Sequence, residues 1–161
     1  MNLRQNIERM FPKEIITRHT LQELAGELWD EAELAKLSGV NNWKDILELD
    51  VASISEFGFG GLYQFMEADM LLAYLPALLY FARAEPYPYA SMVTNLVALL
   101  DPDKKVPDVD ENRVGYLKKN LTRDQKLFVA DTFDYIAQRD FQNQSLLFDR
   151  VQRLSSFWRE A

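Results

Sequence analysis

The stretch MLLAYLPALLYFA, residues 70–82, contains no charged side chain and is apolar on most faces of a helix. A helix that is apolar nearly all round must be covered by other elements. We therefore predict a central helix over residues 67–83, bent near Leu72 because Pro76 has no N–H to donate to that carbonyl. The thirteen uncharged residues fall short of the about 20 that span a bilayer, so we expect no membrane partner.

Helix signals flank this stretch on both sides. One capping box, Thr20-Leu-Gln-Glu23, opens a helix that Gly39 ends, and a second, Thr122-Arg-Asp-Gln125, opens another. No segment alternates apolar and polar residues for long, although a short strand at 114–117 stays open. We predict an all-α, single-domain bundle of about six to seven helices over residues 1–161. The remaining predicted helices are 3–11, a short one at 43–47, 91–100 and one carrying Leu147 to Trp158, and the predicted loops are 57–61, 85–89 and 101–112.

Composition sets the outer bounds on function. The 161 residues (18.8 kDa) suit one domain, and they include no cysteine and a single histidine, His19. This excludes a disulfide scaffold, a thiolate zinc site and paired-histidine metal motifs. The net charge of −7 argues against a nucleic-acid partner. Because cysteine and an apolar leader are both absent, we expect a cytoplasmic protein.

The acidic side chains are concentrated in one part of the chain. Residues 23–56 hold nine acidic side chains and two lysines, whereas residues 101–161 hold eleven of each sign. On a single helix the acids of its first half share one face with a leucine. We hypothesise that this face binds a basic protein partner, and the alternative is a face that only keeps the protein soluble. The predicted partner-binding residues are Glu23, Glu27, Asp30, Glu31 and Leu34.

The same carboxylates support a second hypothesis. Glu23, Glu27 and Asp30 stand at positions i, i+4 and i+7, which places all three within reach of one Mg²⁺ ion. This spacing resembles the metal-binding helix of the all-α nucleotide pyrophosphohydrolases of the MazG type, and the resemblance implies a magnesium-dependent hydrolase. That family has a second acidic helix, and the nearest candidates here, Glu67–Asp69 and Asp131–Asp134, differ from it in spacing and residue type. A third hypothesis is a structural or oligomeric helical module without a ligand.

Three short motifs occur in a characteristic order. They are Trp43-Lys-Asp-Ile46, the Tyr74-Leu-Pro-Ala77 stretch of the central helix, and Leu121-Thr-Arg-Asp-Gln125. Together they resemble a group of small, acidic, all-helical bacterial proteins of unassigned function, some of them associated with toxin-immunity genes. The resemblance implies an immunity protein that neutralises a basic, nuclease-type toxin. It carries over no catalytic residue, and this hypothesis calls for neither a cofactor nor a metal. The oligomeric state stays open.

Overall fold

The computed structural model describes residues 1–49, 61–84, 90–104 and 112–161, and every regular element in these residues is helical. The predicted all-α fold is therefore confirmed. Of the loops predicted at 57–61, 85–89 and 101–112, residues 57–60, 85–89 and 105–111 lie outside the described residues. The elements are α1 (Leu3–Met10), α2 (Leu21–Leu28), α3 (Glu31–Ala35), α4 (Trp43–Ile46), the 3₁₀ turn η2 (Tyr63–Phe65), α6 (Ala68–Arg83), α7 (Ala90–Leu99), α8 (Arg113–Asn120), α9 (Arg123–Asp140) and α10 (Ser145–Glu160).

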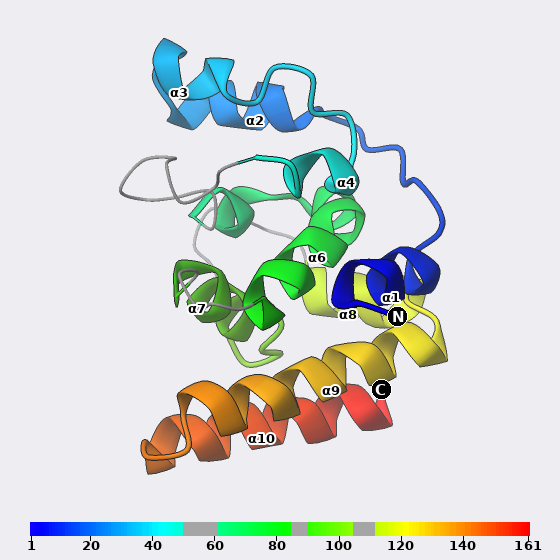
Figure 1. Ribbon diagram of the computed structural model, residues 1–161, viewed down its shortest axis with the longest axis vertical. Coiled ribbons are helices and arrows are strands. Elements are labelled where there is room, and N and C mark those ends of the chain that lie inside the picture. The colour runs from blue at the N-terminus through cyan, green and yellow to red at the C-terminus, as the bar shows by residue number, and fades with distance from the viewer. Residues whose placement is uncertain (50–60, 85–89, 105–111) are drawn as a thin grey trace.

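Helix α6 is the centre of the molecule, as its apolar sequence predicts. Nearly all of its side chains are buried, and Pro76 lies in the middle of the helix. Helices α1, α4, α7, α8 and α9 all contact it, and Figure 1 shows it between the α2–α3 end and the α9–α10 pair. The burial of an apolar helix on all sides explains why the chain needs several helices around one core.

Helices α9 and α10 form a hairpin along one side of the molecule (Figure 1). The predicted capping box opens α9: the Thr122 hydroxyl accepts from the Gln125 N–H at 3.2 Å, and the Gln125 side chain accepts from the Thr122 N–H at 2.9 Å. On α10, the buried indole of Trp158 donates to the carbonyl of Leu100 at 3.0 Å. This bond ties the C-terminal hairpin to the end of α7.

The helix predicted from Thr20 to Gly39 is wrong, because the chain forms two helices there. Helix α2 ends at Leu28, Trp29 is extended, and Asp30 is the N-cap of α3. The Asp30 carboxylate accepts from the backbone N–H of Glu33 at 2.9 Å. An aspartate stabilises a helix start more than a helix interior because its short side chain bonds the free amides there.

Two further expectations from the sequence concern residues 114–117 and Gly39. The open possibility of a strand at 114–117 is resolved as helix, since those residues lie in α8. Gly39 has a φ of 83°, the left-handed conformation that glycine adopts without strain. It therefore turns the chain after the α3 region, as expected, although α3 itself ends earlier, at Ala35.

Candidate binding site

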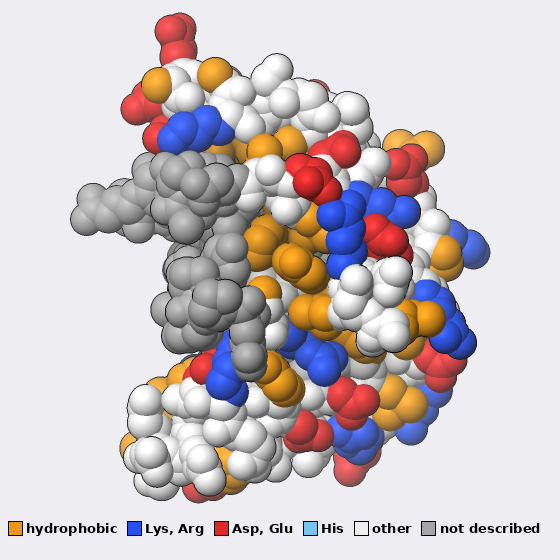
Figure 2. Space-filling view, viewed as in Figure 1, with side chains coloured by type: hydrophobic (Ala, Val, Ile, Leu, Met, Phe, Trp, Pro, Cys, Tyr) orange, Lys and Arg blue, Asp and Glu red, His pale blue; other side chains and the backbone are white. Residues whose placement is uncertain are grey.

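The acidic surface, defined here as Glu23, Glu27, Asp30 and Glu31, lies on α2, on α3 and between them. These helices form one end of the molecule, where Figure 2 shows acidic and apolar side chains close together. All four side chains are exposed. The Oε2 atom of Glu23 lies 3.1 Å from Nδ1 of His19. Glu27 and Glu31, in contrast, form no ion pair with any described residue. Two unneutralised carboxylates thus face solvent at this end.

The predicted arrangement of this surface needs two corrections. Asp30 caps α3, so the four acids do not form one stripe along a single helix. Leu34 is half-buried and packs against the core, with its Cδ2 atom 3.8 Å from the position that a Cβ on Gly26 would take. It is therefore no exposed anchor. Leu28, the last residue of α2, is 45% exposed instead. Sequence periodicity alone puts it on the buried side with Leu21 and Leu24.

The magnesium hypothesis loses its geometric basis at the same break. Glu23 and Glu27 lie on α2, whereas Asp30 and Glu31 belong to the start of α3. In the part of the chain that the structure describes, no three acidic or histidine side chains gather closely enough to hold a metal ion. The single-helix arrangement of Glu23, Glu27 and Asp30, from which this hypothesis started, is therefore not present in the structure.

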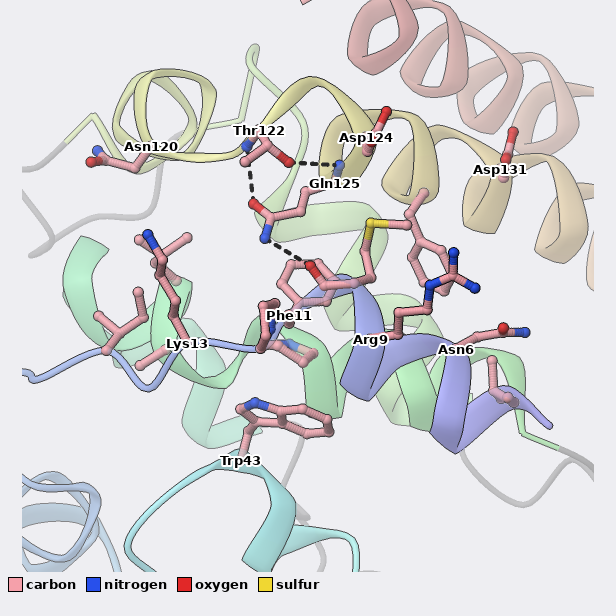
Figure 3. Close-up of a pocket in the computed structure, with 18 of the residues that line it drawn as sticks. Asn6, Arg9, Phe11, Lys13, Trp43, Asn120, Thr122, Asp124, Gln125 and Asp131 are labelled. Carbon is pink, nitrogen blue, oxygen red and sulfur yellow. Dashed lines mark hydrogen bonds between the residues drawn. The ribbon is translucent and has the colours of Figure 1, made fainter. Parts of the chain in front are cut away.

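A pocket of about 730 Å³ lies between α1, the start of α9 and one side of α6 (Figure 3). Its apolar lining includes Phe11, Trp43, Leu72, Pro76 and Phe128. Pockets of about 300–1,000 Å³ with an apolar lining and a few polar groups are typical of small-molecule sites. The volume and the lining thus make this the second candidate site.

Gln125 holds the two walls of the pocket together. Its amide nitrogen donates to the carbonyl of Met10 at 3.0 Å, while its oxygen serves the capping box with Thr122. Figure 3 shows the side chain between Thr122 and the end of α1. Both of these hydrogen bonds of the Gln125 side chain stabilise the fold. Sequence reasoning missed the pocket because these partners are 115 residues apart, and no local signal indicates that α1 packs against α9.

Arg83 supplies the half-buried charge of the pocket. Its guanidinium lies over the ring of Phe128, 5.0 Å from the centroid, and over Tyr135 at 5.3 Å. Burial lowers its pKa, and the negative charge of Asp131 offsets part of this effect. Asp131 is itself paired with Arg159 at 3.0 Å. Among the described residues, Arg83 has no carboxylate within ion-pair distance and no hydrogen-bond acceptor.

The charges on the pocket rim are of both signs. Arg9 and Lys13 are exposed cations, and Asp124 is an exposed carboxylate. Figure 3 places Arg9 and Lys13 on different sides of Phe11. Because water screens exposed charges, these groups act on a ligand less strongly than Arg83 does.

Comparison with known proteins adds no identification. No family model, no curated protein and no solved structure matches this chain. The resemblance to toxin-immunity-associated proteins therefore stays a prediction. Of the helices in the described ranges, none combines the length and the apolar character needed to cross a bilayer.

Proposed function

We propose that this protein is a protein-binding module whose acidic surface on α2 and α3 binds a basic protein partner. In its most concrete form it is a cytoplasmic immunity protein that neutralises a nuclease-type toxin. The observation that carries the proposal is the pair Glu27 and Glu31, exposed at one end of the molecule and unneutralised by any described residue. Nucleases contact phosphates through basic surfaces, so an acidic protein surface can occupy the same groove.

The charges and the apolar side chain of this surface have different roles. Exposed carboxylates raise the association rate by attracting a basic partner over several ångströms, and salt weakens the attraction. They contribute little to the lifetime of the complex. Leu28 lies next to Glu27 in sequence and exposes nearly half of its surface, so it replaces Leu34 as the proposed apolar anchor.

The test compares two charge reversals of equal size. Glu27→Lys with Glu31→Lys changes the acidic surface, whereas Asp149→Lys with Glu160→Lys changes two exposed acids of α10. Asp30 is left intact because its carboxylate caps α3. The partner is first captured from a lysate, and its association with each variant is then measured at low and high salt.

We expect the reversal on α2 and α3 to slow association by about tenfold or more at low salt, and the α10 reversal to slow it much less. Leu28→Ala should shorten the lifetime of the complex. If the captured partner is a nuclease, wild-type protein should abolish its activity and the Glu27/Glu31 variant should restore part of it. Equal effects of the two reversals would show that only net charge matters and would refute the proposed surface.

A further inference from the structure

The pocket beside α1 combines an apolar interior with a cation, Arg83, that pairs with no carboxylate among the described residues. Phe11, Pro76 and Phe128 line it, and Arg83 stands at its wall with its charge directed to no described carboxylate. An arginine packed against two aromatic rings has its apolar faces covered and its N–H donors still available. We propose that this pocket binds a small apolar molecule that carries one carboxylate, with Arg83 as the anchor for the carboxylate.

The size of the pocket fits such a molecule. A volume of about 730 Å³ is that of sites for drug-sized ligands, in which the apolar body provides most of the buried surface. Phe11 and Phe128 already pack edge to face, with ring centroids 6.4 Å apart. They offer an aromatic ligand a wall of the same kind, which favours an aryl or alkyl chain over a sugar or a nucleotide.

The surrounding charges favour a carboxylate over a phosphate. A guanidinium matches a carboxylate with two parallel hydrogen bonds, and one half-buried arginine balances one negative charge. A phosphate dianion would bring a second negative charge toward Asp131, whose field already reaches Arg83. Arg159 engages Asp131 at 3.0 Å, so Asp131 is partly neutralised and leaves Arg83 available for a monoanion.

The proposal is tested by calorimetric titration of the full chain with matched probes. The probes are 3-phenylpropionate and its uncharged counterpart 3-phenylpropan-1-ol. We expect the acid to bind at least about tenfold more tightly than the alcohol, as a charge-assisted hydrogen bond in a partly buried site implies. Equal binding of the two, or no binding of the acid at millimolar concentration, would overturn the proposal.

Variants locate the effect. Arg83→Met keeps the apolar stem over Phe128 and should abolish the preference for the acid, whereas Arg153→Met, an exposed arginine of α10, should leave it unchanged. Should Arg83→Met fail to fold by circular dichroism, Ala73→Leu provides a second test, since it fills pocket volume without altering charge and should weaken both probes. Retained acid preference in a folded Arg83→Met, or unchanged binding in Ala73→Leu, contradicts the proposal.

A carboxylate on an apolar body can come from a metabolite or from the C-terminus of a peptide. A second pair of probes, a tetrapeptide ending in phenylalanine with a free or an amidated C-terminus, separates these sources. Binding of the free-acid peptide alone, at or above the affinity of 3-phenylpropionate, indicates a peptide end. Binding of 3-phenylpropionate with no binding of either peptide indicates a small molecule, and both results support the carboxylate site.

Discussion

Leu75→Ala removes the isopropyl group of a side chain that lies at the centre of α6 and is fully buried. The helix cannot shift to refill the space easily, because α1, α4, α7, α8 and α9 all pack against it. We therefore expect a large loss in the free energy of unfolding, since a cavity remains where neighbours hold each other in place.

The magnitude follows from the burial. Transfer of the lost carbon atoms out of the core costs about 2 kcal/mol at about 0.8 kcal/mol per buried methylene. The cavity adds to this, and measured Leu→Ala changes in cores span about 2–5 kcal/mol. We expect about 3 kcal/mol, which for a chain of this size lowers the melting temperature by roughly 6–12 °C.

The measurement is urea unfolding followed by circular dichroism, with Leu146→Ala as the matched control. Leu146 is 85% exposed on α10, so its truncation should cost less than about 0.5 kcal/mol. The dependence of the unfolding free energy on urea should stay the same in all three proteins. A cost below about 1 kcal/mol for Leu75→Ala, or one equal to that of Leu146→Ala, would refute α6 as the packed centre.

Two further predictions concern the side-chain cap of α8 and the hydrogen-bonded carboxylate of Asp69. A Cβ on Gly115 would lie 2.6 Å from the Asn112 side chain that caps α8. Gly115→Ala should therefore stabilise the folded protein by about 1 kcal/mol only when Asn112→Ala is also present. Additive effects of the two substitutions in a double-mutant cycle would contradict this. Burial raises the pKa of Asp69, but hydrogen bonds from the N–H groups of Arg18 and Met70 outweigh burial and lower it. The stabilisation by the Asp69 carboxylate is thus present at neutral pH and lost as the pH falls below about 4. Asp69→Asn should therefore lower the free energy of unfolding at pH 7, and the variant and the wild type should become equally stable in acid. A stability difference that is constant with pH would count against this prediction.

The sequence was sufficient for the helices whose signals are local. The uncharged run of α6 and the Thr122 capping box depend on residues within a few positions of each other, and both elements appear as predicted. Their burial follows from the same pattern, because a helix that is apolar on all sides has no other place than the core. Fold class is therefore accessible from periodicity and caps alone.

The acidic helix shows where local reasoning fails. The apolar spacing of Leu21, Leu24 and Leu28 continues across Trp29, and it predicts one helix as far as Gly39. The capping strength of Asp30, with the N–H of Glu33 at 2.9 Å, stops that helix instead. Periodicity and capping favour different structures here. The carboxylate of Asp30, which accepts a hydrogen bond from a backbone N–H, stabilises the break between α2 and α3. The four acids of the candidate surface are exposed, as predicted, but Leu34 is half-buried and the acids do not share one helix.

The pocket required information that no sequence window contains. Its two walls are α1 and the start of α9, and the hydrogen bond from Gln125 to Met10 connects them. None of the residues of the acidic surface lines the pocket, and the described contacts link neither Glu27 nor Glu31 to Arg83. Sites without shared partners respond additively to substitution. Charge reversal on α2 and α3 should therefore leave carboxylate binding unchanged, and Arg83→Met should leave partner association unchanged, so that either proposal can fail without the other.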